Sequence, residues 1–206
     1  MTLPVKPSLL ILDCDGVLVS SREANIAYYN HMLENFGMPL VSPDDAKRVG
    51  IFHSHSTKQV IEIFFPESVR GAVMEYAADL DYSEFAALVN PEPGWEDALL
   101  KISEKMRICV ATNRGHSANA LLDAANLATY IDRVFTIHDV KNPKPAPDIL
   151  KLALDVFDTD AGDALYVGDS ELDLKAAQAA AVPFVGFRLE APLSIGTPAE
   201  LEVLLR

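Results

Sequence analysis

Two acidic residues, Asp13 and Asp15, follow directly on a run of apolar residues near the start of the chain. The run 9–12 predicts a buried strand, and Gly16 indicates that the strand gives way to a loop. Side chains two residues apart in extended chain point to the same side, so both carboxylates should face one site. Ligands bind at the carboxyl ends of strands in open α/β sheets. The alternative is that the two acids only stabilise a turn.

Polar residues that could bind an anion follow a second apolar run. Thr112 and Asn113 offer a hydroxyl and a backbone N–H ahead of a predicted helix, which suits a phosphate oxygen, although both could simply cap a turn. Lys144 lies between Pro143 and Pro145, which stiffen the backbone and could hold an ammonium group in a fixed place. The alternative for this lysine is an ordinary solvated loop residue.

A further pair of acids, Asp169 and Asp173, follows the predicted strand 164–168. Their spacing of four residues places both on one side of a first helical turn, where acids are also favoured by the helix dipole alone. Bringing these acids together with Asp13 and Asp15 would be unfavourable unless a cation lay among them. Hard oxygen ligands of this kind suit Mg²⁺, which also binds substrate phosphate.

The composition of the chain indicates which partners and which compartment to expect. The 206 residues carry a formal net charge of −13 and no cluster of Lys and Arg, which argues against nucleic acid as a partner. The two cysteines, Cys14 and Cys109, lie in apolar runs and indicate a reducing compartment. No signal peptide or membrane span is evident. We therefore expect a cytoplasmic monomer or homodimer that binds a small molecule and neither nucleic acid nor membrane.

The order of the predicted elements indicates an α/β fold with a helical insertion. Helical patterns fill residues 20–90, with expected helices over 22–37, from about 42, over 56–65 and over 66–88. From residue 91 onward helices and strands alternate, which implies right-handed crossovers and a parallel sheet. We expect a Rossmann-like, three-layer core domain formed by 1–19 and 91–206, and a small all-helical domain formed by 20–90, inserted after the first strand.

Four motifs in this order resemble those of the haloacid dehalogenase superfamily: Asp13 to Leu18, Thr112-Asn113, Lys144-Pro145, and Gly168 to Asp173. The helical insertion looks like the cap domain of the branch that contains phosphoglycolate phosphatase and β-phosphoglucomutase. Haloacid dehalogenases proper lack the second acid of the first motif, so Asp15 argues for phosphoryl chemistry. Phosphoglucomutase relatives show a Glu-Asp pair at the fourth motif, whereas Gly168-Asp169 resembles the phosphatases.

The resemblance implies a role for each catalytic residue. Asp13 would attack phosphorus and form an aspartyl-phosphate, and Asp15 would protonate the leaving oxygen and then activate water. Thr112 and the backbone of Asn113 would hold phosphoryl oxygens, and Lys144 would steady the nucleophile and the developing charge.

The resemblance also implies a metal site and a specificity region. Mg²⁺ would be bound by Asp13, the backbone carbonyl of Asp15, and Asp169, with Asp173 reaching it directly or through water or Ser170. Gly16 and Arg114 would line the phosphate site. Residues of the cap would set specificity: Arg22, His53 and His55, with Lys47 and Arg48 as further polar candidates; His53 and His55 could also be ordinary surface residues.

The sequence thus predicts a Mg²⁺-dependent phosphatase that hydrolyses a small phosphomonoester metabolite, with phosphoglycolate or a sugar phosphate as candidate substrates. A phosphomutase would use the same residues but return the phosphoryl group to a sugar phosphate. A non-catalytic protein that binds phosphorylated metabolites is the alternative outside enzymes, and it would have no need of Asp15.

Overall fold

The computed structural model describes residues 6–115 and 117–206, and the chain divides into two compact units. We call the first the core unit, which comprises Met1–Ser20 and Pro91–Arg206, and the second the helical unit, which comprises Ser21–Asn90. The polar residues at the predicted strand ends all belong to the core unit, so the site is built there.

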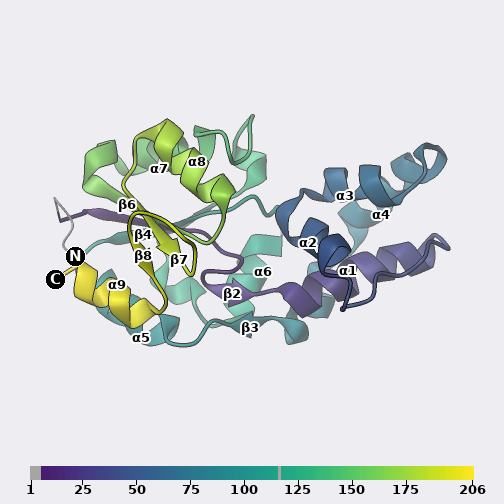
Figure 1. The fold of residues 1–206 in the computed structure, drawn as a ribbon, viewed down its shortest axis with the longest axis horizontal. Helices are drawn as coiled ribbons and strands as arrows, with labels where there is room; N and C mark the ends of the chain where they lie inside the picture. Colours follow the sequence, from purple (N-terminus) through teal and green to yellow (C-terminus); the bar gives the residue numbers. More distant parts are fainter. Residues whose placement is uncertain (1–5, 116) are drawn as a thin grey trace. The chain divides into compact units, whose positions relative to one another are not determined.

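A six-stranded sheet forms the centre of the core unit, with the strand order β5-β4-β1-β6-β7-β8 (Figure 1). The strands are β1 (Leu9–Leu12), β4 (Arg107–Ala111), β5 (Arg133–Phe135), β6 (Ala164–Gly168), β7 (Phe184–Phe187) and β8 (Ser194–Ile195). Every neighbouring pair is parallel, which confirms the predicted fold class. Two short strands, β2 (Val19–Ser20) and β3 (Asn90–Pro91), form a separate sheet.

Strand β1 lies in the middle of the sheet because all four of its residues are apolar and buried. A strand that is buried on both faces reads as a continuous apolar run, as this one does. Leu12 is opposite Val110 of β4 and Val167 of β6. This register brings the residues that follow the three strands to the same edge of the sheet.

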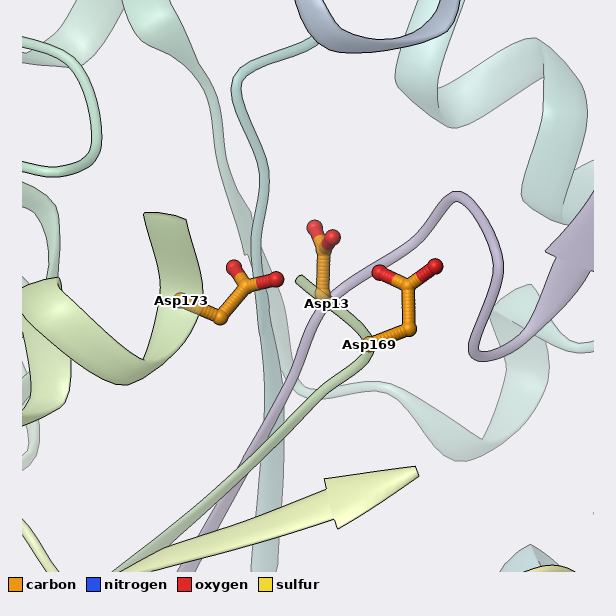
Figure 2. A group of neighbouring side chains, drawn as sticks. All are labelled: Asp13, Asp169 and Asp173. Carbon is orange, nitrogen blue, oxygen red and sulfur yellow. The ribbon is translucent and has the colours of Figure 1, made fainter. Parts of the chain in front are cut away.

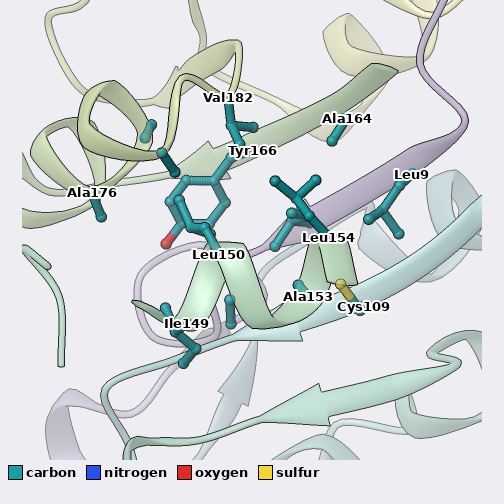
Figure 3. Close-up of a cluster of buried hydrophobic side chains, with 14 of the residues drawn as sticks. Leu9, Cys109, Ile149, Leu150, Ala153, Leu154, Ala164, Tyr166, Ala176 and Val182 are labelled. Atoms are coloured by element: carbon teal, nitrogen blue, oxygen red, sulfur yellow. The ribbon is translucent and has the colours of Figure 1, made fainter. Parts of the chain in front are cut away.

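Helices cover both faces of this sheet. Helices α7 (Asp148–Phe157) and α8 (Glu171–Ala180) pack on one face, where the apolar cluster of Figure 3 lies. Helices α5 (Trp95–Ser103) and α9 (Pro198–Leu204) pack together on the other face (Figure 1). The remaining connections contain α6 (Ser117–Ala124) and the 3₁₀ turns η3 (Ala128–Tyr130), η4 (Ile137–Asp139) and η5 (Ala161–Asp163). The result is the predicted three-layer arrangement.

The helical unit contains α1 (Arg22–Asn35), α2 (Ala46–Ser54), α3 (Thr57–Phe64), η1 (Glu67–Val69), α4 (Arg70–Asp79) and η2 (Tyr82–Leu88). Helix α1 ends at Asn35, shortly before Gly37, the glycine expected to stop it, which has a φ of 66°. The N–H of Met38 donates to the carbonyl of Leu33, and that of Gly37 donates to Glu34. This is a Schellman motif, whose left-handed residue is usually glycine.

Two helix boundaries differ from the prediction. Helix α2 begins after Asp45, a few residues later than the expected start near residue 42, and the Asp45 side chain caps it by accepting from the N–H of Arg48. The predicted helix 66–88 is divided into η1, α4 and η2. The break after α4 allows the rings of Tyr82 and Phe85 to pack on Tyr28 of α1, with centroid distances of 5.2 and 5.6 Å. Aromatic packing therefore overrides helical continuity here.

None of the helices in the described ranges has the length and apolar character needed to cross a membrane.

Candidate active site

Three acidic residues meet at the carboxyl edge of the sheet (Figure 2). Asp13 follows β1, Asp169 follows β6, and Asp173 lies on the first turn of α8. One carboxylate oxygen from each lies within 4.8 Å of the others. The three side chains therefore converge although they come from two distant parts of the chain, as the parallel sheet requires.

Two glycines make room for these acids. A Cβ atom at Gly16 would lie 1.9 Å from Oδ2 of Asp169, and one at Gly168 would lie 2.4 Å from Cβ of Asp173. Gly16 also has a φ of 78°, a conformation that other residues adopt only with strain. Gly16, which we expected to line a phosphate site, thus contributes by letting the Asp169 carboxylate lie against the backbone.

The ammonium group of Lys144 is buried among these acids. Its Nζ lies 2.6 Å from Oδ1 of Asp173 and 2.9 Å from Oδ1 of Asp13. It also donates to the carbonyl of Ala111 at 3.1 Å and to the hydroxyl of Tyr166 at 2.9 Å. Burial by itself lowers the pKa of Lys144, but the charges of Asp13 and Asp173 more than reverse this and raise the pKa above its usual value. The ammonium therefore stays charged.

The side chain of Asn113 holds the loop that carries Lys144. Its Nδ2 donates to the carbonyl of Lys144 at 2.9 Å, and its Oδ1 accepts from the N–H of Lys144 at 2.8 Å. The neighbouring Thr112 is buried, and its Oγ1 accepts from the N–H of Arg114 at 3.1 Å. The side chain of Asn113 is thus engaged with the backbone of Lys144, which the sequence did not indicate.

Both carboxylate oxygens of Asp173 accept hydrogen bonds from the protein. Oδ1 accepts from Lys144 and from the hydroxyl of Tyr166 at 2.5 Å, and Oδ2 accepts from the N–H and the hydroxyl of Ser170. Burial raises the pKa of Asp173, but the Lys144 ammonium and these hydrogen bonds outweigh it and lower the pKa. Asp173 is therefore ionised, and its main contact is Lys144.

Asp13 and Asp169 differ from Asp173 in that their pKa values are raised. Burial raises the pKa of Asp13 well above its usual value, and the charges of Asp173 and Asp169 add to the effect. Burial and the charge of Asp173 raise the pKa of Asp169 to about 7. Oδ1 of Asp13 is buried and, within the described residues, accepts no aligned hydrogen bond. Two neighbouring carboxylates with raised pKa values fit a divalent cation, which would stabilise both ionised forms.

Asp15 is held by Arg114. The guanidinium donates from Nε to Oδ2 at 2.8 Å and from Nη2 to Oδ1 at 2.6 Å, and its Nη1 donates to the hydroxyl of Ser117 at 3.2 Å. We expected Asp15 to lie with the metal ligands and Arg114 to bind phosphate. In this structure their side chains bind each other, and the acidic cluster consists of Asp13, Asp169 and Asp173.

The predicted specificity residues lie in the helical unit. Arg22 donates to the carbonyl of Pro43 at 2.7 Å. Nδ1 of His53 lies 3.1 Å from Nδ2 of the buried Asn25, and His55 is exposed at the end of α2. The other two candidates lie on the same helix: Lys47, and Arg48, whose guanidinium lies 5.0 Å from the centroid of the Phe64 ring.

Sequence reasoning missed Tyr166. It lies inside β6, where an aliphatic residue would satisfy the apolar pattern, and its hydroxyl contacts both Lys144 and Asp173. The signal that could have found it is a tyrosine in an otherwise apolar, fully buried strand, because a buried phenol needs a polar partner.

Comparisons with known proteins identify the family of this chain. The model of the family described as "Haloacid dehalogenase-like hydrolase" matches residues 10–187. "Probable phosphatase IndB" of Dickeya dadantii is 31% identical over 88% of this chain and 81% of its own length. "Pyrophosphatase PpaX" of Bacillus velezensis is 27% identical over 86% of this chain and 81% of its own. A crystal structure of a haloacid dehalogenase superfamily hydrolase, subfamily IA, from Geobacter sulfurreducens superposes with a TM-score of 0.81, at 33% identity, over 98% of each chain.

The parallel sheet, the acids at its carboxyl edge and these relatives together define a hydrolase built on a parallel sheet between helical layers. More specifically, the chain belongs to the haloacid dehalogenase-like hydrolase family. The family membership that the four motifs predicted is thereby confirmed, and so is the similarity to phosphatases.

Proposed function

We propose that this protein is a Mg²⁺-dependent phosphatase that hydrolyses a small phosphorylated metabolite through an aspartyl-phosphate on Asp13. The observation that carries the proposal is the surroundings of Asp13. Its buried carboxylate lies beside the Lys144 ammonium, at the strand end where Asp169 also converges. A carboxylate nucleophile needs charge compensation of this kind before it can approach an anionic phosphoryl group.

Two displacements at phosphorus account for the hydrolysis. In the first, an oxygen of Asp13 forms a bond to phosphorus while the bond to the leaving oxygen breaks, and Asp15 gives that oxygen a proton. In the second, water attacks the phosphorus of the aspartyl-phosphate, Asp15 takes a proton from the water, and the Asp13 carboxylate is released with inorganic phosphate. Asp15 ends each cycle in the protonation state in which it began.

Fixed positive charge and hydrogen-bond donors would hold the transferred group. Thr112 offers its hydroxyl and Asn113 its backbone N–H to the phosphoryl oxygens, and Lys144 contributes the positive charge of its ammonium, all from loops at the same sheet edge. Donors that are already in place cost no reorganisation when charge develops in the transition state. The pairing of Asn113 with the Lys144 backbone supports this, because it ties two of these loops together.

Asp13 and Asp169 would hold the metal ion, with the backbone carbonyl of Asp15. When bound, Mg²⁺ supplies positive charge that offsets the carboxylates and the phosphoryl group together. Asp173 would act mainly by holding Lys144, and its reach toward the metal would run through water or Ser170. The raised pKa values of Asp13 and Asp169 support a cation here, because ionising both is unfavourable without one.

The names of the relatives and the net charge of the chain support a small phosphorylated substrate. The similar proteins are named phosphatase and pyrophosphatase, and we propose a small phosphomonoester such as phosphoglycolate or a sugar phosphate, with pyrophosphate as a further candidate. The net charge of −13 disfavours a polyanionic partner such as nucleic acid. Two buried free cysteines, Cys14 and Cys109, suit an enzyme of the cytoplasm, as a monomer or homodimer.

Phosphate release from a panel of these compounds, with Mg²⁺ or with EDTA, tests the proposal. We expect metal-dependent release by the unchanged protein and its loss in Asp13→Asn, which keeps the shape of the side chain but removes the nucleophile. Asp155→Asn is the matched control, because it removes one charge from the exposed side of α7. Release that survives in Asp13→Asn would contradict the aspartyl-phosphate. No release from any compound, with phosphoryl transfer between sugar phosphates instead, would indicate a mutase.

A further inference from the structure

Tyr166 connects the apolar core to the charged site. It is fully buried in β6, and its ring lies among apolar side chains that include Leu150, Ala176 and Val182 (Figure 3). The Phe184 ring packs against it with a centroid distance of 5.8 Å. Its hydroxyl reaches polar groups, and Nζ of Lys144 also lies 5.7 Å from the centroid of its ring.

The directions of the hydrogen bonds at this hydroxyl follow from the chemistry of its partners. Lys144 carries an ammonium that can only donate, so the phenol oxygen accepts from it at 2.9 Å. The single phenol hydrogen is then directed to Oδ1 of Asp173, 2.5 Å away. A phenol keeps this hydrogen at neutral pH. Lys144, Tyr166 and Asp173 thus form a cyclic hydrogen-bond network, in which each side chain is bonded to the other two.

Three groups from three different elements accept the three hydrogens of the Lys144 ammonium. They are the carbonyl of Ala111 in β4, the hydroxyl of Tyr166 in β6 and Oδ1 of Asp173 in α8. The ion pair with Asp13 follows from where these three acceptors hold Nζ, because Oδ1 of Asp13 accepts no aligned hydrogen bond among the described residues. A lysine side chain has four flexible bonds, so its position must be imposed from outside.

We propose that Tyr166 is a positioning residue for the reaction, whose hydroxyl fixes the Lys144 ammonium against the nucleophile Asp13. The inference rests on the proposed function, in which Lys144 balances charge on the phosphoryl group. The Tyr166 hydroxyl bonds to Lys144 and Asp173, and it acts through these two residues. Because it lies outside the four sequence motifs, its contribution is visible only in the structure.

The competing explanation is that the phenol is an ordinary core residue whose hydroxyl happens to find acceptors. The two explanations differ in what Tyr166→Phe changes. This variant keeps the ring and its packing, and Lys144 keeps Ala111 and Asp173 as acceptors, so the fold should persist. Positioning predicts a loss of rate, whereas an ordinary core role predicts a change in stability alone.

Kinetics of Tyr166→Phe make the first test, with Tyr130→Phe in η3 of the same unit as the matched control. We expect kcat to fall about tenfold with KM nearly unchanged, a smaller loss than removing a group that touches the developing charge. Inhibition by vanadate, which mimics the transition state, should weaken in proportion to kcat/KM, while inhibition by inorganic phosphate stays within about twofold. A kcat within about twofold of the unchanged protein, or equal weakening of both inhibitors, overturns the proposal.

A readout that does not depend on activity keeps this inference separate from the proposed function. Lys144 is 5% exposed, and its acetylation by acetic anhydride in the folded protein can be followed by mass spectrometry of its peptide. We expect Tyr166→Phe to speed this labelling severalfold, with no change in Tyr130→Phe. If the unchanged protein releases no phosphate, the proposed function fails, and an unchanged labelling rate would then overturn the positioning of Lys144 as well.

Discussion

Arg114 holds the carboxylate of Asp15 through two hydrogen bonds, of 2.8 and 2.6 Å. The pair is largely buried, with side-chain exposures of 10% for Arg114 and 24% for Asp15. A planar guanidinium that matches both oxygens of a carboxylate fixes its orientation as well as its charge. The group proposed to transfer the proton is therefore oriented by a residue that follows a different strand.

Replacing this guanidinium should slow the reaction by disturbing Asp15. Arg114→Lys keeps the positive charge but cannot bind both oxygens in one plane. Since hydrogen bonds to charged groups contribute about 1.5–3 kcal/mol, we expect kcat/KM to fall about tenfold or more. Phosphate release under steady-state conditions measures this, and Lys175→Gln, which removes an exposed ion pair with Glu171, is the control.

A double-mutant cycle tests whether Arg114 affects the reaction through Asp15. If Arg114 acts through Asp15, then Arg114→Lys should cost little more in the Asp15→Asn background, since the interaction is already lost there. Independent, multiplying losses would contradict this and would indicate that Arg114 contacts the substrate directly.

Gly16→Ala should damage the metal site more than the fold. The new Cβ would lie 1.9 Å from Oδ2 of Asp169, so the carboxylate must move. Strain at the φ of 78° adds roughly 1–2 kcal/mol of destabilisation. We expect the Kd for Mg²⁺, measured by calorimetry without substrate, to rise at least severalfold and Tm to fall by a few degrees.

Gly37→Ala is the control that separates backbone strain from the displacement of Asp169, the two effects expected of Gly16→Ala. Gly37 has a similar φ of 66°, but a Cβ there would meet nothing within 4 Å. We expect the same loss of stability without a change in Mg²⁺ affinity. Equal metal affinities in Gly16→Ala and Gly37→Ala would show that Asp169 does not depend on the close approach of Gly16.

The convergence of the acids was predictable, whereas their partners were not. Apolar runs that end in Asp13 and Asp169 identify the ends of parallel strands, and such ends must meet at one edge of a sheet. The spacing of four residues then brings Asp173 to the same side. Which group each carboxylate binds depends on side-chain reach across elements. For that reason the sequence could not indicate that Asp173 contacts Lys144 or that Asp15 contacts Arg114.

The helix boundaries also show that local sequence does not predict contacts between distant residues. Local pattern located α1 and its glycine end correctly, because the signals lie within a few residues of one another. It failed where α4 ends, because the rings of Tyr82 and Phe85 pack on Tyr28, more than fifty residues away in the chain. Packing between distant residues overrides local propensity in such places.

The stability of the metal-free protein should fall as pH rises toward 7. Folding raises the pKa of Asp169 from 3.8 to about 7, so between these values the folded protein keeps a proton that the unfolded chain has released. A state that binds more protons loses relative stability as pH rises, by at most about 1.4 kcal/mol per pH unit for one group. Asp173, whose pKa is lowered, loses its contribution only in stronger acid.

Thermal unfolding in EDTA, over the range from about pH 5 to about pH 8, measures this effect. Asp169→Asn is the matched variant, and its Tm should depend less on pH than that of the unchanged protein. Saturating Mg²⁺ should reverse the trend, because metal ligands bind in their deprotonated form and the stabilisation by metal then grows with pH. A Tm in EDTA that depends on pH identically in both proteins would contradict the raised pKa of Asp169.

Substituting His53, which lies in α2, or His55, which follows the end of α2, should change substrate preference more than the rate of the chemical step. Nδ2 of Asn25 can only donate, so Nδ1 of His53 accepts from it, and the ring proton lies on Nε2. Oδ1 of Asn25 accepts from the hydroxyl of Tyr82 at 2.7 Å. With this orientation of the amide, Nδ1 is the accepting nitrogen of the His53 ring.

We expect His53→Ala or His55→Ala to change the ratio of kcat/KM between two phosphorylated substrates about tenfold, which corresponds to about 1.4 kcal/mol of differential binding. The panel of phosphate-release rates measures this ratio directly. Asn25→Leu serves as the comparison for His53, because it removes the partner of Nδ1 and leaves the ring in the chain. Equal losses on every substrate would contradict a role in specificity. A ratio that changes in Asn25→Leu as it does in His53→Ala would show that the tautomer, and not only the presence of the ring, determines which substrate is preferred.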